Sequence, residues 1–230
     1  MRKFNNFNAS LILIPTPIGN LGDVTRRAIE YLSSVDIIFC EDTRRAKTLL
    51  ANLTISKPVQ SLHSHNERQQ IEKVLEFLER GDKVAYISDS GTPGISDPGI
   101  ALVRSAQESG FSVMVLPGAA ALVPAVVMSG LPCDKFIFLG FSPASNTKRR
   151  RLLRELADFP YSIVFYEAPH RIAKMLKDSF DILGNRNCAV VREISKIHEE
   201  VLQGTLEELI ACFAENKPRG EIVLVIQGNE

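Results

Sequence analysis

The sequence predicts an α/β protein of two domains, with a mainly parallel sheet in the first domain and a mixed sheet in the second. In the first half, short apolar segments alternate with amphipathic helical patterns, which is typical of repeated β–loop–α units. In the second half, the apolar segments 189–194 and 200–203 are too close in sequence for an intervening helix and indicate an antiparallel pair. We place the boundary at Pro117, between domains 1–116 and 117–230.

The elements of the first half follow from apolar spacing and from the residues that begin or end each segment. The predicted strands are Leu11–Ile14, Asp36–Cys40, Val59–Leu62, Lys83–Ser88 and Phe111–Leu116. Helical spacing predicts four helices, one after Asp23 and the others over Thr43–Asn52, Glu67–Arg80 and Asp97–Ser109. Asp23 and the Asp97–Pro98 pair are expected to cap the first and fourth of these helices.

The second half contains five further strands and four further helices by the same criteria. The predicted strands are Phe136–Leu139, Ser162–Tyr166, Ala189–Ile194, Glu200–Gln203 and Ile222–Ile226. The predicted helices are Ala119–Ser129, Thr147–Ala157, Pro169–Phe180 and Thr205–Glu215. The sequence contains no internal repeat or low-complexity segment.

The charge balance of the chain limits the partners that it can bind. Its 230 residues include 27 basic and 27 acidic residues, so the chain has no overall basic character. Any contact with nucleic acid must therefore come from local basic clusters, or from a partner that supplies most of the surface. Composition alone favours an enzyme that acts on small molecules.

The cysteines and the first residues indicate the compartment. The four cysteines, Cys40, Cys133, Cys188 and Cys212, show no C-x-x-C spacing, so we expect ordinary thiols and neither a zinc site nor disulfides. The first apolar segment, which begins at Leu11, is too short for a signal peptide or a membrane span. We therefore expect a reduced, cytoplasmic protein that does not associate with a membrane.

Three loops follow strands of the first half at the edge where α/β sheets bind ligands, namely residues 15–23, 41–45 and 88–99. The third loop reads SDSGTPGISDPG, and its glycines allow the backbone to approach a ligand closely. It contains no Lys or Arg, which argues against a bound phosphate and favours a cationic ligand such as a sulfonium. A structural Gly/Pro turn is the alternative, but twelve patterned residues favour a ligand loop.

A nucleotide-binding fold is the main rival interpretation. Gly19 and Gly22 follow the first strand and Glu41 ends the second, a spacing similar to that of a dinucleotide-binding fold. The glycine pattern G-x-G-x-x-G is absent, however, and two prolines interrupt the turn. A P-loop is excluded because G-x-x-x-x-G-K-[ST] does not occur. A dinucleotide site therefore stays open as the weaker alternative.

Seven motifs occur in one order along the chain: PTPIGNLGDVT, EDTR, LHSHNE, SDSGTPGISDPG, GLP, FYEAPHR and REISKIHEE. From Leu11 to Gly228 the chain thereby resembles the 16S rRNA cytidine 2′-O-methyltransferases within the tetrapyrrole methylase superfamily. The resemblance implies a two-domain class III methyltransferase fold, S-adenosylmethionine in the cleft between the domains, a homodimer, and 16S rRNA of the small ribosomal subunit as substrate. A precorrin-type tetrapyrrole methyltransferase of the same fold is the alternative. A nicotinamide enzyme or a non-catalytic binding module is the third hypothesis.

The resemblance and the loops together imply a set of residues that bind S-adenosylmethionine. These are Pro17, Asp89, Ser90, Gly91, Thr92, Pro93, Pro117, Gly118, Ala119, Ala120, Tyr166 and Glu167. Two of them depart from the family pattern, since Ser90 and Ala119 stand where the family usually has alanine and proline. Both replacements keep a small side chain beside the expected cofactor.

A ribose 2′-hydroxyl is a weak nucleophile, so we expect a base or a hydrogen-bond acceptor beside it. The candidates for this catalytic role are Glu41, Asp42, His65 and Asn66. Methyl transfer needs no metal, and the H-x-H pair of His63 and His65 lacks an evident third ligand.

The candidates for RNA binding are Arg44, Arg149, Arg150, Arg151, His170 and Arg171. The densest basic cluster, Lys148–Arg154, begins a predicted helix, where the helix dipole disfavours positive charge. A bound phosphate would offset that cost.

Overall fold

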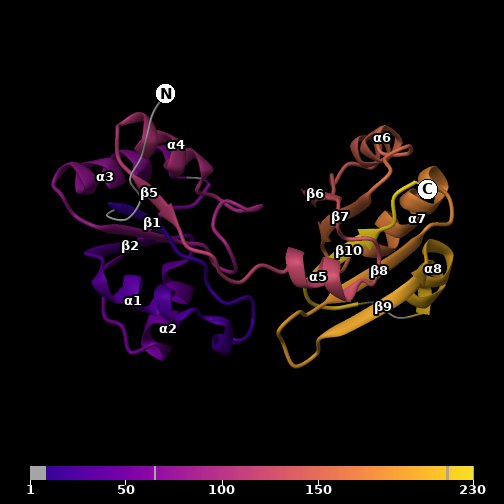
Figure 1. Cartoon of the computed structure of the whole chain (residues 1–230), viewed down its shortest axis with the longest axis horizontal. Coiled ribbons are helices and arrows are strands. Elements are labelled where there is room, and N and C mark those ends of the chain that lie inside the picture. Colours follow the sequence, from indigo (N-terminus) through magenta and orange to yellow (C-terminus); the bar gives the residue numbers. More distant parts are fainter. Residues whose placement is uncertain (1–8, 65, 216–217, 230) are drawn as a thin grey trace. The chain divides into compact units, whose positions relative to one another are not determined.

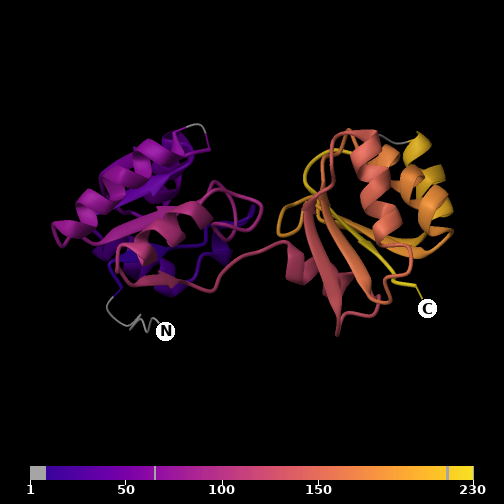
Figure 2. The same cartoon turned by 90° about the horizontal axis from the view of Figure 1, so that it is seen from above.

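The computed structural model describes residues 9–64, 66–215 and 218–229, and Figures 1 and 2 show the chain in two views. The chain divides into two compact units, one up to Ala120 and one from Ala121 onward. This division falls after Ala120 rather than at Pro117, because Gly118 and Ala119 contact residues of the first unit. In the described part of the chain, no helix is both long and apolar enough to cross a membrane.

The first unit contains a five-stranded sheet in the order β3-β2-β4-β1-β5, with every neighbouring pair parallel. Its strands are β1 (Leu11–Leu13), β2 (Ile37–Cys40), β3 (Val59–Ser61), β4 (Val84–Ile87) and β5 (Val113–Val115). The central strands β1, β2 and β4 are buried along their whole length, as expected for a parallel sheet covered on both faces. The predicted parallel sheet is confirmed.

Four α-helices cover the two faces of this sheet, two on each face. Helices α1 (Arg26–Ser34) and α2 (Thr43–Asn52) contribute Ala28, Leu32, Ala46 and Leu50 to the hydrophobic cluster on one face. Helices α3 (Glu67–Glu79) and α4 (Ile100–Glu108) contribute Ile71, Val74, Leu78, Leu102 and Ala106 to the cluster on the other face. A short 3-10 helix, η2 (Leu21–Asp23), precedes α1.

Neighbouring strands of this sheet are therefore followed by helices on opposite faces. Strand β4 lies between β2 and β1; it leads into α4, whereas β2 leads into α2 and β1 into α1. Such a reversal opens a crevice beyond the carboxyl ends of the strands, where ligands bind in α/β sheets. The loops after β1, β2 and β4 meet at this edge.

Two of the predicted helix caps are wrong. Helix α1 is capped by Thr25, whose side chain accepts a hydrogen bond from the Ala28 amide at 3.0 Å, while Asp23 lies in η2. Helix α4 begins at Ile100 after Gly99, so the Asp97 carboxyl does not cap it. Gly99 has a φ of +127°, which interrupts the helical path between Asp97 and Ile100.

The second unit contains a mixed five-stranded sheet in the order β6-β7-β10-β8-β9. Its strands are β6 (Phe136–Phe141), β7 (Ser162–Glu167), β8 (Asn187–Arg192), β9 (Glu200–Thr205) and β10 (Ile222–Ile226). Strands β6 and β7 are parallel, and the other neighbouring pairs are antiparallel. The predicted mixed sheet and the antiparallel pair of β8 and β9 are confirmed.

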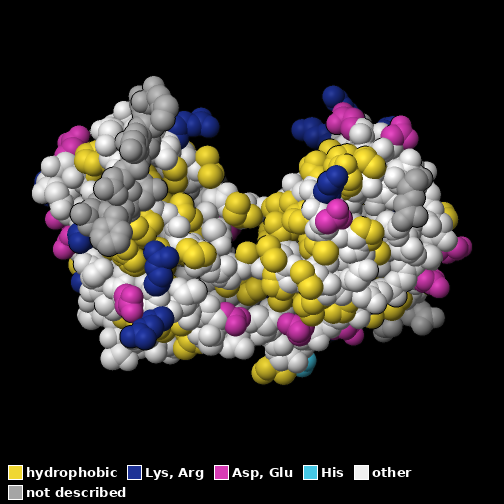
Figure 3. Space-filling view, in the orientation of Figure 1, with side chains coloured by type: hydrophobic (Ala, Val, Ile, Leu, Met, Phe, Trp, Pro, Cys, Tyr) yellow, Lys and Arg dark blue, Asp and Glu magenta, His cyan; other side chains and the backbone are white. Residues whose placement is uncertain are grey.

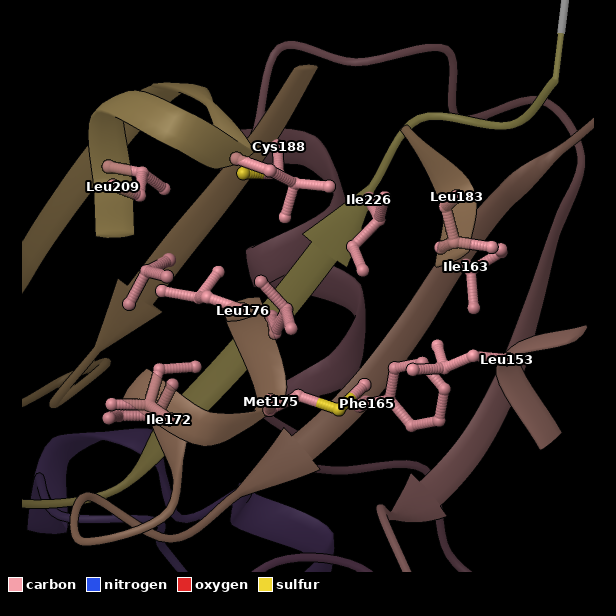
Figure 4. Close-up of a cluster of buried hydrophobic side chains, with 14 of the residues drawn as sticks. Leu153, Ile163, Phe165, Ile172, Met175, Leu176, Leu183, Cys188, Leu209 and Ile226 are labelled. Carbon is pink, nitrogen blue, oxygen red and sulfur yellow. The ribbon is translucent and has the colours of Figure 1, made fainter. Parts of the chain in front are cut away.

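Helices α6 (Asn146–Glu155), α7 (Ile172–Leu183) and α8 (Leu206–Glu215) pack on one face of this second sheet, and α5 (Leu122–Met128) contacts β10. Figure 4 shows the cluster under these helices, with Met175 of α7 beside Phe165 of β7. Both side chains are almost completely buried. This core fixes the end of β7, where Glu167 lies, and His170 and Arg171 follow it.

Candidate active site

The loops after β1 and β4 are joined by a short antiparallel bridge between Thr16 and Gly91. The Thr16 amide donates to the Gly91 carbonyl at 2.9 Å, and the Gly91 amide donates back at 3.0 Å. The Thr16 hydroxyl donates to the Ser88 carbonyl at 3.2 Å. Gly91 has a φ of +78°, and a Cβ atom there would lie 3.3 Å from Cγ2 of Ile18. Glycine is therefore required both by the backbone conformation and by the close approach of the two loops.

The segment after β5 joins the same two loops. The Thr92 hydroxyl donates to the Ala119 carbonyl at 3.1 Å. The Cα of Gly118 lies so close to Pro15 that a Cβ atom would lie 2.5 Å from the proline ring. The first unit thus brings together most of the predicted cofactor residues, namely Pro17, Ser90, Gly91, Thr92, Pro93, Pro117, Gly118, Ala119 and Ala120.

Asp89 ties the loop after β4 to the loop after β2. Its carboxylate accepts a hydrogen bond from the Asp42 amide at 3.0 Å and lies 3.6 Å from the Arg45 guanidinium. Its own amide donates to Glu41 Oε1 at 3.3 Å. Asp89 therefore positions the EDTR segment, a role that its place at the end of a strand did not reveal.

An open pocket of about 550 Å³ lies in the first unit between the β1 loop and helix α2. Its lining combines apolar side chains with ionic groups of both signs, and its residues are Thr16, Pro17, Gly19, Leu21, Cys40, Asp42, Arg44, Arg45, Ala46, Thr48, Leu49, Asn52, Ile87, Ser88 and Asp89. The volume falls within the range of small-molecule sites. Cys40 is a buried thiol, and burial and the nearby Asp89 raise its pKa to about 12, so it is not a nucleophile.

The two candidate carboxylates of the EDTR segment differ in their electrostatics. Asp42 caps α2 through the Arg44 amide at 2.8 Å and pairs with the Arg44 guanidinium at 2.8 Å. These hydrogen bonds lower the pKa of Asp42 to about 2, so it is a poor base. Burial raises the pKa of Glu41 above its ordinary value, helped by the charges of Asp97 and Asp89. Of the two, Glu41 has the environment of a general base.

Asn66 holds the LHSHNE segment in place and does not cap the helix that follows. Asn66 precedes α3, but its side chain makes no capping bond to that helix. Instead, its Oδ1 accepts from the His63 amide at 2.8 Å, and its Nδ2 donates to the Ser61 carbonyl at 3.4 Å. Asn66 is thus engaged in shaping its own loop. The predicted catalytic His65 lies outside the described residues.

In the second unit, Glu167 is a buried partner of Arg171. The Arg171 Nε lies 3.1 Å from Glu167 Oε1, and the Ser142 hydroxyl donates to the other carboxylate oxygen. Arg171 also donates to the Ser142 hydroxyl at 2.7 Å. Glu167 and Arg171 therefore fix the turn after β7, because their charged groups are occupied by each other and by Ser142. His170 is exposed, and the Tyr166 ring packs edge-on against Phe138 at a centroid distance of 4.8 Å.

The basic cluster at the start of α6 is only partly available to a partner. Arg149 is buried, and its guanidinium lies 2.5 Å from Asp178 on α7. Arg150 reaches Asp178 at 2.7 Å and Asp181 at 3.0 Å. Arg151 is exposed and pairs with Glu155 on its own helix. The expectation that all three arginines face RNA is therefore wrong for Arg149, because its charge is compensated inside the protein.

Comparison with known proteins identifies the family. The profile of the Tetrapyrrole (Corrin/Porphyrin) Methylases matches residues 10–210. The chain is 47% identical over 219 residues to the ribosomal RNA small subunit methyltransferase I of Synechocystis sp., and the match covers 95% of this chain and 78% of the relative. It is 44% identical to the protein of the same name from Thermotoga maritima, over 96% of this chain and 99% of the relative. The chain belongs to the ribosomal RNA small subunit methyltransferase I family of tetrapyrrole methylases.

The relative from Escherichia coli O157:H7 with the same name is 41% identical over 98% of this chain and 80% of its own length. The fold of this methyltransferase family is also that of a cobalamin biosynthetic enzyme, cobalt precorrin-4 methyltransferase, whose crystal structure matches with a TM-score of 0.71 at 15% identity over 94% of both chains. At this identity the likeness shows the fold alone.

The methyltransferases of this family use S-adenosylmethionine, and the loops of the first unit suit it. Residues 88–99 contain no Lys or Arg, and the lack of a side chain at Gly91 lets the loops after β1 and β4 approach each other closely. Carbonyl groups and a carboxylate suit a sulfonium and an ammonium group better than a phosphate.

Sequence reasoning missed several residues that shape this site. Thr16 and Ser88 hold the loops together, but a single hydroxyl in a loop carries no distinctive signal. Ser142 lies outside the quoted motifs and reaches Glu167 only because β6 and β7 are neighbours. The sequence predicts Asp97 as a helix cap, whereas the structure places it half-buried in the loop after β4, outside α4.

Proposed function

We propose that this chain transfers the methyl group of S-adenosylmethionine to the 2′-hydroxyl of a cytidine ribose in 16S rRNA of the small ribosomal subunit. The observation that carries the proposal is the high identity, over nearly the whole chain, to relatives named ribosomal RNA small subunit methyltransferase I. The backbone cradle at Thr16, Gly91 and Gly118 supports the cofactor part of the proposal. The cytoplasm and a homodimer are the expected location and assembly.

When bound, S-adenosylmethionine supplies an electrophilic methyl group on a positively charged sulfur. Pro17, the segment 90–93 and the segment 117–120 would hold it. Because the transfer is an in-line displacement, these residues would act mainly by fixing the methyl donor in the position that the acceptor oxygen approaches.

Glu41 would accept the hydroxyl proton as the ribose oxygen forms its bond to the methyl carbon. The raised pKa of Glu41 suits this role, because a base with a pKa closer to the working pH both accepts and releases a proton readily. The bond between Glu41 and the Asp89 amide would hold one carboxylate oxygen and leave the other to face the substrate. Asp42 would orient Arg44, whose exposed guanidinium is available to an RNA phosphate.

Mass spectrometry of 16S rRNA tests the proposal directly. Cells that lack this protein are expected to lose one ribose methyl group from a cytidine, and purified protein with S-adenosylmethionine is expected to restore it on small subunits from those cells. An unchanged methylation pattern in the deleted strain would contradict the proposal.

A second experiment tests the role of Glu41. Glu41→Gln is expected to lower kcat on small subunits by about 10²–10⁴-fold, the usual contribution of a general base, without changing the affinity for S-adenosylmethionine. Asp42→Asn serves as the control and is expected to change kcat much less. Equal losses in the two variants would remove Glu41 from the role of base.

A methyltransferase that acts on a tetrapyrrole is the alternative function. It has the support of the matched family profile and of the fold shared with the precorrin enzyme. Incubating the purified protein with S-adenosylmethionine and a precorrin substrate would detect this activity, and methylation of the precorrin but not of rRNA would favour it.

A further inference from the structure

Strand β6 is an edge strand of the second sheet and ends in an exposed aromatic side chain (Figure 1). Phe141, the last residue of β6, is 56% exposed. A single exposed apolar residue is common on protein surfaces and indicates no function by itself. In this protein, however, a β-bulge, a neighbouring ring and two arginines all fix the position of Phe141.

The β-bulge decides which face of the sheet Phe141 occupies. Phe138 pairs with Val164 of β7. Phe141 pairs with Tyr166, so a step of three residues on β6 matches a step of two on β7. Residues three apart in a regular strand point to opposite faces, but the extra residue returns Phe141 to the face of Phe138. Gly140, with a φ of +64°, lies in this bulge. Bulges of this kind re-aim a side chain and are frequent beside active sites.

The bulge brings three aromatic rings together on one face. The Tyr166 ring packs edge-on against Phe138 at a centroid distance of 4.8 Å and against Phe141 at 5.7 Å. In an edge-on pair each ring covers at most one face of the other, so at least one face of the Phe141 ring is not covered by Tyr166. Phe141 therefore presents an aromatic surface that is both fixed and accessible to solvent.

Two arginines fix the loop that follows Phe141. The Arg171 guanidinium donates to the Ser142 carbonyl and, at 2.7 Å, to the Ser142 hydroxyl. The buried Arg149 donates to the next two carbonyl groups of the loop, at 3.4 and 3.5 Å. Three consecutive carbonyl groups after Phe141 thus accept hydrogen bonds from guanidinium groups. A backbone that is already ordered lowers the entropy cost of binding a ligand on the ring.

The charges of the surrounding segment favour an anionic partner. Residues 136–154 contain no Asp or Glu and five basic residues, namely Lys148, Arg149, Arg150, Arg151 and Arg154. Of these, Lys148, Arg151 and Arg154 are exposed, and α6, which carries them, begins five residues after Phe141. An aromatic ring near basic side chains is typical of proteins that bind single-stranded nucleic acid, because the ring stacks on a base while the cations attract the backbone.

We propose that Phe141 stacks on an unpaired base of the rRNA, with Tyr166 as the residue that positions its ring. This inference rests on the proposed methylation of rRNA. Every base has a π face, so stacking discriminates little between bases. Phe141 would therefore contribute affinity and hold the strand in place, while the choice of the methylated nucleotide is made elsewhere. The exposed cations of α6 would contact phosphates of the same strand.

The adenine of S-adenosylmethionine and a second copy of this chain are the competing occupants of the ring. The cations favour RNA over the methyl donor, because S-adenosylmethionine has no phosphate and carries a positive sulfonium. A contact between two copies about a two-fold axis at Phe141 would bring two basic segments together, which repulsion between like charges opposes.

Substitutions at Phe141 test the inference on small subunits. Phe141→Leu keeps an apolar side chain but removes the aromatic face, and it is expected to raise KM about 5- to 150-fold while kcat and the affinity for S-adenosylmethionine stay unchanged. Phe141→Tyr is expected to retain the wild-type KM, because it keeps the ring. Phe136→Leu is the matched control, since Phe136 is an exposed residue at the other end of the same strand. Urea denaturation verifies that each variant is folded.

Tryptophan fluorescence identifies the occupant. The chain contains no tryptophan, so Phe141→Trp supplies a single probe at this position. Its emission is expected to be quenched by a single-stranded RNA oligonucleotide that contains the methylated cytidine, and not by an oligonucleotide of the same length without bases. Phe136→Trp is the control and is expected to respond to neither.

The outcomes separate this inference from the proposed function. A wild-type KM in Phe141→Leu, or equal emission of Phe141→Trp with and without RNA, would overturn the inference and leave the proposed function standing. Quenching by the oligonucleotide without bases, or by S-adenosylmethionine alone, would also overturn it. A change of emission on dilution without RNA would assign the ring to a contact between two copies, with the same consequence. A wild-type protein that methylates no rRNA would overturn both.

Discussion

Charged side chains of this protein have different roles depending on their partners, even when they are neighbours in sequence. Glu41 and Asp42 are adjacent, but Arg44 lowers the pKa of Asp42 whereas burial raises that of Glu41. Divergence of this kind is how one site obtains both an anionic anchor and a base. On α6, Arg149 is buried and ion-paired while Arg151 faces solvent.

Arg149→Ala is expected to lower the free energy of unfolding by about 3 kcal/mol, because it leaves part of the Asp178 charge buried without its partner. Arg151→Ala, the matched change two residues away, should cost less than about 0.5 kcal/mol, since its pair with Glu155 is exposed. Urea denaturation measures both values. Equal losses in the two variants would contradict the burial of Arg149.

The Asp178 pair also predicts a dependence of stability on pH. Burial opposes ionisation of Asp178, but hydrogen bonds from Arg150 and Arg149 outweigh it and lower its pKa below 3.8. The unfolded chain therefore binds the proton first as the pH falls, so the contribution of Asp178 is complete well above pH 3.8 and is lost as the pH falls through its lower folded pKa.

Unfolding free energies measured between pH 6 and pH 3 are expected to fall less steeply for Asp178→Asn than for the wild type. Asp181→Asn is the control, because Asp181 is more exposed and contacts Arg150 alone. If the unfolding free energy of Asp178→Asn fell with pH as steeply as that of the wild type, the arginines would not lower the pKa of Asp178 in the folded state.

At the scale of elements, the site is built from loops that are far apart in sequence and are joined by backbone hydrogen bonds. The bridge between Thr16 and Gly91 connects loops more than 70 residues apart, and Thr92 connects the second of them to Ala119. Backbone groups join the loops after β1 and β4, whereas the Asp89 carboxylate joins the loop after β2 to them. Carbonyl groups and a carboxylate suit this edge of the sheet to a cationic cofactor.

Gly91→Ala is expected to lower the affinity for S-adenosylmethionine several-fold and to cost about 1–2 kcal/mol of stability, since its φ is +78° and the added methyl group meets Ile18. Gly110→Ala has nearly the same backbone cost, because its φ is +88°, but it meets nothing within 4 Å. Calorimetry with S-adenosylmethionine and urea denaturation separate the two effects. A similar loss of affinity in both variants would show that close approach at Gly91 does not matter.

At the scale of the whole molecule, a chain without net charge must bind RNA through local patches. On the face of the second unit shown in Figure 3, dark blue basic side chains lie beside magenta acidic ones at the end where α6 is found. Lys148, Arg151 and Arg154 are the exposed basic residues of this helix. We expect them, rather than Arg149, to contact phosphates.

The double change Arg151→Ala with Arg154→Ala is expected to weaken binding to small subunits and to reduce the slope of log K against log salt by up to about 2. Lys83→Ala, at the start of β4 and so at the opposite edge of the first sheet, is the control and should leave the slope unchanged. An unchanged slope in the double variant would remove α6 from the RNA-binding surface.

Local patterns in the sequence were enough to predict the order of strands and helices, the parallel first sheet, the mixed second sheet and the loops at the carboxyl edge of the first sheet. These follow from patterns that are local, such as the buried segment Val84–Ile87 or the helical spacing of Ile71, Val74 and Leu78. The family also followed from motifs in the right order. The predicted start of α4 was wrong because a tertiary contact decides it: the backbone at Gly99 rests on the Tyr86 ring.

Which charges are free and which are paired depends on the packing of elements that are distant in sequence. Arg149 and Arg150 meet Asp178 because α6 packs on α7, and Glu167 meets Ser142 because β6 lies beside β7. In the first unit, the backbone at Gly99 meets the Tyr86 ring through the fold of the loop after β4. Electrostatic energy depends on the distance between charges and on their burial. Neither quantity can be derived from the spacing of residues along the chain.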